Sequence, residues 1–370
     1  MVARPMVAAW LIVGRPARTR SAIETAATEI ESTQPNARRA DRCGLMTAPR
    51  QILTGQFYFI TRRTLLRMHL LRPSPEVNRM IEYCLAEAAD RCDIQLITWC
   101  VMSNHYHAVV YDPDRNVLVF IERFHRMVAK VLNRHHGRFE SFWSREQTCV
   151  VRLVTNADVL DKVVYTLTNP AAAHLVEDVG HWAGSSSWTR MGRPGKKLKR
   201  PSAYFCVDGS MPKEVELRAN VPHGLDGARA EKWIQSVREA VIARQRTLAK
   251  ERTRPVVGVK RVLAMNPTDS PRTDAPRWNL NPHLACKDRE RMKLERKQLL
   301  EFRHKYREML MRLRTGEGDI EFPDGTYRLR LLGLRCKACA EGTSSTRRKA
   351  PTKTRESAHA EKAAYALAWQ

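Results

Sequence analysis

The stretch DIQLITWCVMSNHYHAVVYD, Asp93–Asp112, decides the fold. It contains two apolar, β-branched runs, each long enough to form one strand. Only the polar pair Ser103-Asn104 separates them, and a short polar pair of this kind is typical of a tight turn. The stretch therefore predicts a β-hairpin whose second strand carries a pair of histidines, His105 and His107.

The segments on either side of this hairpin predict the rest of a sheet. GQFYFITRR (Gly55–Arg63) and TCVVRLV (Thr148–Val154) have the composition of strands. Residues 75–91 carry apolar side chains at helical spacing, and so does the run that starts at Asn116. The order β-α-β-β-α-β is that of a ferredoxin-like fold. We therefore expect an α+β protein with a palm-like antiparallel sheet and helices on one face.

Composition divides the rest of the chain. Residues 1–48 are expected to be a disordered or spurious extension, with Met46 as an alternative start. Residues 50–190 hold the predicted sheet and form the main domain. Residues 191–213 are predicted to be a basic loop, residues 214–335 a helical region of open role, and residues 340–370 a mostly disordered basic tail.

The charge of the chain indicates a polyanionic partner. Lys and Arg number 64 against 39 Asp and Glu in 370 residues, which gives a net charge of +25. Such an excess creates a field that attracts nucleic acid, and counterion release makes that binding sensitive to salt. An acidic membrane surface is the alternative, but the sequence has no long basic amphipathic helix with an aromatic face.

The nine cysteines are scattered without a disulfide framework. Cys336 and Cys339 form the only C-x-x-C, and a structural zinc site normally needs a second pair. We expect a reduced, cytoplasmic compartment, where a basic protein of this kind associates with the nucleoid.

The histidine pair is the first candidate site. Side chains alternate along a strand, so His105 and His107 point to one face while Tyr106 points to the other. One reading is a structural pair, with one histidine satisfied by hydrogen bonds and the other exposed. The second reading is an open cation site that borrows oxygen ligands from elsewhere, as Mg²⁺ does.

A tyrosine on the next helix is the second candidate. This helix is predicted to begin at Thr155, which has the spacing of a capping box with Asp158, and to end at Asn169-Pro170. At 100° per residue, Tyr165 lies opposite the apolar stripe and on the side of Asn169. It is either a solvent-facing tyrosine or a nucleophile, with Asn169 one turn further on as an oxygen ligand. A phenol beside a divalent cation can attack a phosphodiester and form a phosphotyrosine, so that the strand is later rejoined without ATP.

Several motifs together resemble a known family. NHYHAVV resembles the motif of the HUH single-tyrosine transposases, and YTLTNPAAAHLVED is similar to the helix that carries their nucleophile. GRFESFWSRE and SSSW fall where the family has a Gly/Trp segment and a Ser-Ser motif. The most similar branch is that of the REP-associated tyrosine transposases, and the resemblance covers roughly residues 50–190.

The resemblance implies a site and an activity. His105 and His107 are implied as metal ligands, Asn169 as the third ligand and Tyr165 as the nucleophile. The family cleaves and rejoins single-stranded DNA beside imperfect palindromic hairpins with Mg²⁺ or Mn²⁺. Tyr106 departs from the smaller residue usual between the two histidines. The chain after about residue 210 has no counterpart in the smallest members.

Basic side chains are the candidates for DNA contact, because guanidinium and ammonium groups follow phosphates. The strongest stretch comes after the tyrosine helix and comprises Arg190, Arg193, Lys196, Lys197, Lys199 and Arg200. Further candidates lie on the first strand and on the second helix: Arg62, Arg63, Arg123, Arg126 and Lys130. A solvated basic loop is the alternative for the first group.

Two other functions use the same features. A domesticated protein would bind hairpins without cutting them, although all four residues of the implied site are present. A rolling-circle replication initiator would nick an origin, usually together with a helicase, and no phosphate-binding G-x-x-x-x-G-K-[ST] occurs in the chain. The sequence leaves open whether the protein is a homodimer.

Overall fold

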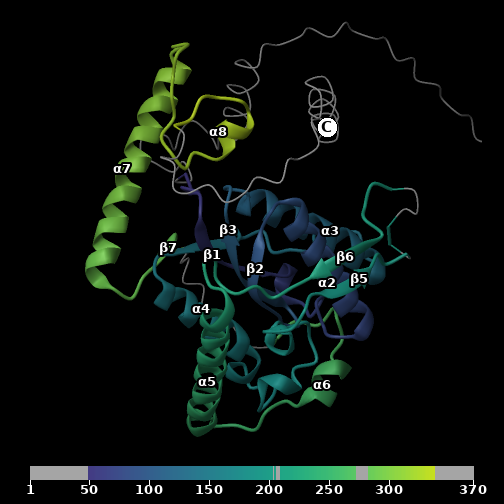
Figure 1. Cartoon of the computed structure of the whole chain (residues 1–370). Helices are drawn as coiled ribbons and strands as arrows, with labels where there is room; N and C mark the ends of the chain where they lie inside the picture. The colour runs from purple at the N-terminus through teal and green to yellow at the C-terminus, as the bar shows by residue number, and fades with distance from the viewer. Residues whose placement is uncertain (1–48, 203, 206–208, 272–281, 338–370) are drawn as a thin grey trace, which may run out of the picture. The chain divides into compact units, whose positions relative to one another are not determined.

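The centre of the molecule is a five-stranded sheet with strand order β2-β3-β1-β4-β7 (Figure 1). Its strands are β1 (Gln56–Arg63), β2 (Gln95–Val101), β3 (His105–Asp112), β4 (Cys149–Leu153) and β7 (Leu284–Ala285). The first four pair antiparallel, and their connections through α2 (Pro75–Arg91) and α3 (Val117–His135) confirm the predicted ferredoxin-like order. The fifth strand, β7, pairs parallel to β4 and was not predicted.

The computed structural model describes residues 49–202, 204–205, 209–271 and 282–337, and these all belong to the compact unit that ends at Lys337. The extension predicted for residues 1–48 and the tail predicted for residues 340–370 lie outside the described residues, as does Cys339. Within the described part of the chain, no helix is both long and apolar enough to cross a membrane.

Helices α2 and α3 cover one face of the sheet. Ser74 caps α2 by accepting a hydrogen bond from the Val77 amide, and Pro75 occupies the first turn, where its missing N–H costs nothing. The buried Asp112 carboxylate accepts bonds from the first amides of α3, at Asn116 and Val117. The core between these helices and the sheet contains large, fully buried side chains: Tyr58, Tyr83, Trp99, Phe120 and Phe124.

A second helical layer covers the other face. Helices α4 (Asn156–Ala172) and α5 (Gly227–Glu251) bury apolar side chains against the strand residues Phe59, Val109 and Val151. The prediction of helices on one face therefore holds for the ferredoxin-like core, which α2 and α3 cover. The second layer, on the other face, was not predicted. Helix α4 begins with the predicted capping box, but it runs past Pro170 to Ala172. It can do so because a proline in the last turn forfeits a single hydrogen bond while the turn around it persists.

The segment predicted as a basic loop, residues 191–213, is partly a strand. β5 (Lys196–Lys199) pairs with β6 (Glu214–Leu217) in a two-stranded sheet, and both strands pack on α2. Leu198 is buried between exposed lysines, so the lysine-rich run has the alternation of a half-buried strand. The prediction of a loop was wrong here, because an alternation over only four residues is too short to be recognised as a strand in the sequence.

The C-terminal region is mainly helical, as predicted. It contains α5, α6 (Val259–Ala264), the long α7 (Arg289–Arg314) and the short α8 (Arg328–Leu331). Three short 3₁₀ turns complete the described elements, at Leu65–Arg67, Val179–His181 and Trp188–Arg190. The end of α7 and α8 share a small core of their own around Phe322.

Candidate active site

Strand β3 places the two histidines on one face of the sheet, beneath α4. The ring centroids of His105 and His107 are 4.8 Å apart. On the neighbouring strand β1, Arg63 lies directly opposite His105 and Thr61 opposite His107. Residues opposite each other in a sheet point to the same face, so Arg63 also belongs to the histidine face.

His107 is a buried ring whose nitrogens have no partner. The side chain is 5% exposed, and its ring stacks on Phe59 at a centroid distance of 5.5 Å. Among the described residues, neither Nδ1 nor Nε2 has a hydrogen-bond partner. Burial, together with the nearby positive groups, lowers the pKa of His107 well below its usual value, so the ring is neutral. A neutral, buried and unsatisfied imidazole is costly unless something absent from the protein chain binds it.

His105 is held in a similar state by its neighbours. Its Nδ1 donates a 2.7 Å hydrogen bond to the Asn104 side-chain oxygen, which fixes the ring. Burial and then the charge of Arg63 lower the pKa of His105, a hydrogen bond with the Asn169 side chain raises it, and the net value is about 4. At neutral pH both histidines therefore have the unprotonated form that a metal ligand requires.

Helix α4 brings Tyr165 and Asn169 to the same place. The ring centroids of Tyr165 and His107 are 5.3 Å apart in an edge-on arrangement, and the Tyr165 side chain is 46% exposed. Asn169, one turn further along the helix, reaches the ring of His105. Four residues that the sequence spreads over 65 positions, from His105 to Asn169, thus converge in space, with the phenol on the solvent side.

The donor set fits a divalent cation. The imidazoles of His105 and His107 and the amide oxygen of Asn169 offer three ligands, and the exposed side of the site is open to water or substrate oxygens. The main support for this fit is the pair of ring nitrogens of His107, because a bound ion would satisfy one of them. Within the described ranges there is no group of three or more His, Cys, Asp or Glu side chains that could hold a metal, so the amide of Asn169 is needed to complete this set.

Lys162 is a member of this neighbourhood that the sequence interpretation did not single out. Its Nζ lies 5.3 Å from the centroid of the Tyr165 ring and 5.9 Å from that of Phe59. The position was recognisable, because residues three apart on a helix share a face. Its ammonium also pairs with Asp161 at 3.5 Å, and its charge helps to lower the pKa of His107.

Tyr106 lies on the opposite face of the sheet, as strand alternation predicted. Its hydroxyl is 2.7 Å from Nε2 of His125 on α3, and both rings are buried. Burial raises the pKa of Tyr106 far above its usual value. A buried phenol with a hydrogen-bond partner, on the face away from His105 and His107, cannot act at the site.

The SSSW motif secures the edge of the sheet next to the site. The Ser187 hydroxyl lies 2.6 Å from that of Thr98, and Ser185 accepts a 3.0 Å hydrogen bond from the indole of Trp99. The Ser185 hydroxyl in turn donates to Glu82, which also pairs with Lys196 at 2.8 Å. The motif therefore covers the edge strand β2, which would otherwise expose unpaired backbone groups.

Two arginines predicted to contact DNA are only partly exposed, and each binds other groups of the protein. Arg62 donates to the Thr148 hydroxyl at 2.5 Å and to the Ser144 carbonyl at 3.2 Å. Arg123 forms a bidentate ion pair with the carboxylate of Glu87, whose side chain is only 3% exposed. DNA contact by either residue stays a prediction, and both guanidinium groups already bind partners within the protein that the sequence did not reveal.

The other basic candidates differ in their availability. Arg63, Lys130, Arg193 and Lys199 are exposed. Four others are only partly exposed: Arg126, Arg190, Lys196 and Arg200. Lys196 pairs with Glu82, Lys197 with Glu214 at 3.7 Å, and Arg200 donates to the Met211 carbonyl at 2.7 Å. Strand β5 packs on α2, so Lys196, Lys197 and Lys199 lie on the side of the sheet away from the histidines. Arg63 lies directly opposite His105 on the histidine face.

Comparison with known proteins bears on the resemblance to transposases. Residues 59–154 match the family described as IS200-like transposases, which confirms the predicted resemblance. The matched range includes His105 and His107 and ends before Tyr165 and Asn169. The match supports a transposase of the HUH type, a class whose members cleave DNA and generally use a divalent metal.

Solved structures give weaker likenesses. A REP-associated tyrosine transposase bound to a REP hairpin shares 15% identity and covers 50% of this chain and 96% of its own, with a TM-score of 0.35. A Deinococcus radiodurans protein assigned as a transposase shares 17% identity and covers 31% of this chain and 92% of its own, with a TM-score of 0.24. No curated protein matches the sequence.

Proposed function

We propose that the protein cleaves and rejoins single-stranded DNA beside hairpins, with Tyr165 as the nucleophile. The supporting observation is the buried pair of unsatisfied nitrogens on His107, next to a half-exposed phenol. A hydrophobic core normally satisfies the polar atoms that it buries, whereas metal-assisted phosphodiester cleavage requires free ligand atoms beside the nucleophile. The family match over residues 59–154 supports the same class of reaction.

In the proposed reaction the Tyr165 oxygen attacks the phosphorus of a phosphodiester. The bond to the leaving strand breaks, its sugar oxygen takes up a proton as a free hydroxyl, and the DNA remains attached as a phosphotyrosine. The phenolic proton passes to the solvent to which Tyr165 is open. Attack by a hydroxyl on the phosphotyrosine reverses these steps and reseals a strand.

Each neighbouring residue has a part in this reaction. His105, His107 and Asn169 would hold Mg²⁺ or Mn²⁺, which when bound polarises a phosphoryl oxygen and favours the phenolate. Arg63 and Lys162 add positive charge on the same face and attract the phosphate that is to be cleaved. The substrate is single-stranded DNA flanked by REP-like palindromes, as the resemblance to the REP-associated transposases implies.

A covalent-adduct assay tests the proposal. The protein is incubated with a labelled strand that carries a hairpin and with Mg²⁺, and is then separated on a denaturing gel. We expect an adduct with the wild-type protein and none with Tyr165→Phe. Tyr106→Phe is the matched control and should form the adduct, because Tyr106 lies on the other face. An adduct of normal yield with Tyr165→Phe would overturn the assignment of the nucleophile.

The same assay separates the second candidate function. A protein that binds hairpins without cutting them would form no adduct under any metal, and its affinity would not change in His105→Ala. The presence of all four site residues in one place favours cleavage.

A further inference from the structure

Helix α7 carries a row of basic side chains that the proposed reaction does not use. Its buried side chains lie on one side of the helix, centred on Glu295, Leu299 and Phe302. At 100° per residue, a set of basic side chains falls within an arc of about 100° around the helix axis, on a side away from the buried one. This α7 stripe consists of Arg289, Lys293, Arg296, Lys297 and Arg307, all exposed.

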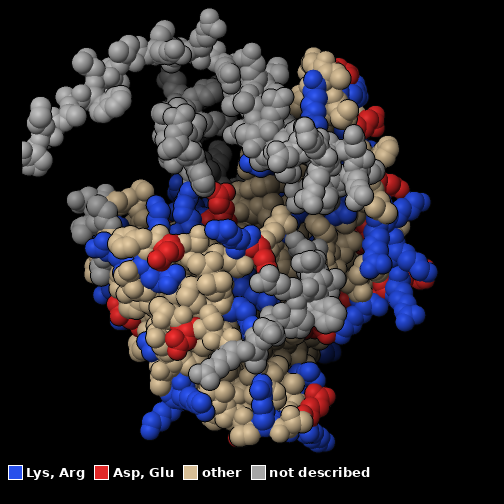
Figure 2. Space-filling model, turned by 180° about the vertical axis from the view of Figure 1, so that it is seen from behind, with Lys and Arg blue, Asp and Glu red and all other residues tan. Residues whose placement is uncertain are grey.

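Most of the stripe is free of competing ion pairs. Lys293 pairs with Glu290 at 2.7 Å on the surface, where such a pair contributes little and opens easily. For the other four members, the described part of the chain shows no ion pair. Seen from behind, Lys and Arg gather at the side of the molecule that α7 occupies (Figure 2).

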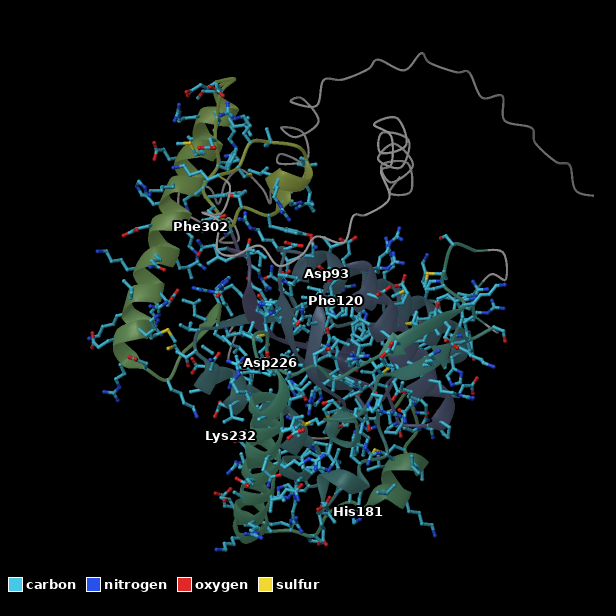
Figure 3. All side chains as sticks on the ribbon, viewed as in Figure 1. Asp93, Phe120, His181, Asp226, Lys232 and Phe302 are labelled. Carbon is cyan, nitrogen blue, oxygen red and sulfur yellow. The ribbon has the colours of Figure 1, made fainter. Side chains whose placement is uncertain are left out.

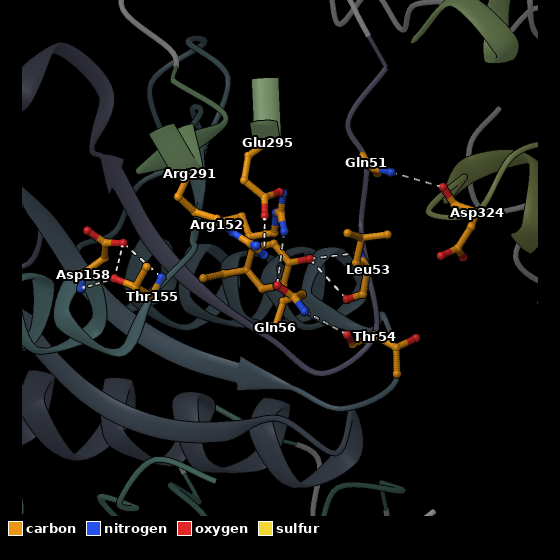
Figure 4. Close-up of polar contacts among 11 residues, drawn as sticks. Gln51, Leu53, Thr54, Gln56, Arg152, Thr155, Asp158, Arg291, Glu295 and Asp324 are labelled. Carbon is orange, nitrogen blue, oxygen red and sulfur yellow. Dashed lines mark hydrogen bonds and ion pairs between the residues drawn. The ribbon is translucent and has the colours of Figure 1, made fainter. Parts of the chain in front are cut away.

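The helix is anchored so that the stripe is held in place. Glu295 forms a buried ion pair with Arg152 on β4 and a 3.0 Å pair with Arg291 (Figure 4). Arg152 also donates to Gln56 at 3.3 Å. Phe302 is 4% exposed on the packed side of the helix (Figure 3). These contacts fix one side of α7 and leave the stripe facing solvent.

The start of α7 lies beside the helix that carries Tyr165. The Lys287 amide donates to Asp158 at 2.9 Å, and its ammonium pairs with Asp161 at 2.5 Å. Asp161 precedes Tyr165 by one helical turn, or about 6 Å along the axis of α4. The stripe therefore begins close to the point where the proposed reaction takes place.

The geometry points to double-stranded DNA as the ligand of the α7 stripe, and we propose that it binds the stem of the hairpin beside the cleaved strand; this rests on the proposed function. From Arg289 to Arg307 the helix extends about 27 Å, a length that spans roughly eight phosphates of one duplex strand. Proteins that hold single strands stack bases on exposed aromatic rings. Both aromatic residues of α7 lie on its packed side, with Tyr306 in contact with Phe302 and Phe322.

The test measures the affinity for a blunt duplex in EDTA, which separates stem binding from cleavage. The variant Arg296→Gln/Lys297→Gln/Arg307→Gln removes three charges at exposed positions and keeps good helix formers. We expect at least tenfold weaker binding at 0.15 M salt. The slope of log K against log salt should fall in magnitude by about 3. Adduct formation on a strand without a stem should be unchanged.

Helix α5, of similar length, supplies the matched control. Lys232→Gln/Arg246→Gln/Lys250→Gln removes the same charge from exposed positions there, and should leave the salt slope unchanged. An equal loss in both variants would mean that only net charge matters, and the proposal would fall. Unchanged duplex affinity in the α7 variant, or loss of self-association instead, would also overturn it. Failure of Tyr165→Phe to abolish the adduct bears on the proposed function alone, since duplex binding needs no cleavage.

Discussion

Two pairs of one histidine and one tyrosine lie on opposite faces of strand β3, and they differ in how their polar atoms are satisfied. On the face of α2 and α3, Tyr106 and His125 bond to each other at 2.7 Å, and Arg62 contacts the second nitrogen of His125 at 3.5 Å. On the face of α4, His107 is equally buried, but neither of its nitrogens has a partner among the described residues, and Tyr165 is half-exposed.

The difference shows what separates a structural pair from a reactive one. Both histidines are neutral because burial lowers their pKa, so neither the residue type nor the pKa distinguishes them. Hydrogen bonding does, because a folded core satisfies its buried polar atoms and a ligand site keeps them free. The neighbouring arginines show the same division. Arg123 is bound to Glu87 on the first face, whereas Arg63 is exposed beside His105 on the second.

The largest expected effect comes from replacing His107 and His125, one at a time, by alanine. His107→Ala should slow adduct formation in Mg²⁺ by roughly 10³-fold, about 4 kcal/mol in the activation barrier, because it removes a metal ligand. His125→Ala should keep its activity per folded molecule, but lose about 2 kcal/mol of stability because the Tyr106 hydroxyl is left without a partner. Adduct yield is measured alongside urea unfolding. Normal cleavage by His107→Ala would remove the distinction between the faces.

The arginines give the next largest effect, and it is one of stability. Arg123→Ala should lower the free energy of unfolding by about 3 kcal/mol, because it leaves the buried carboxylate of Glu87 unpaired. Lys130→Ala, exposed on the same helix, is the control and should change stability by less than about 0.5 kcal/mol. Urea denaturation at neutral pH measures both. A variant at Arg123 with full stability but weakened DNA binding would instead support the prediction that Arg123 contacts DNA.

The smallest effect is a dependence of stability on pH. Burial lowers the pKa of His125 well below its usual value, so the unfolded chain takes up a proton near pH 6.5 that the folded protein does not. Its contribution is complete above pH 6.5 and declines as the pH falls below it, by up to about 1.4 kcal/mol per pH unit.

His125→Gln should reduce that slope by about this amount, since an amide stays neutral throughout. His181→Gln, at an exposed position, serves as the control and should leave the slope unchanged. Unfolding free energies at pH 7.5, 6.0 and 5.0, in the absence of divalent metal, measure the difference. A slope that is the same in both variants would show that His125 does not stay neutral in the folded protein.

Much of the core and the arrangement of the site follow from local patterns. Period-two alternation placed His105 and His107 on one face and Tyr106 on the other, and helical periodicity put Tyr165 and Asn169 on one side of their helix. The order of strands and helices predicted the four antiparallel strands. Strand β7 was not predicted, because a strand of two residues is too short to show an alternation of apolar and polar side chains. The α5 layer escaped it because α5 buries only Val237 and Val241.

The arginines and Lys162 show where local patterns stop. Arg62 and Arg63 are neighbours on one strand, yet one is enclosed by the segment that holds Ser144 and Thr148 and the other faces the histidines. Their partners lie far away in the sequence or on another strand. Lys162 was visible as a member of the polar side of α4, but its distance to the Tyr165 ring came only from the structure.

By itself, the sequence determined which side chains share a face, because the periods of strand and helix are set by backbone geometry within a few residues. It also carried the motifs that resemble the HUH transposases. Only the tertiary structure decided that α4 lies over β3 with Tyr165 beside His107, that His107 is left without partners, and that α7 is anchored through Arg152 and Glu295. Those facts depend on contacts between residues up to 143 positions apart, which no local period encodes.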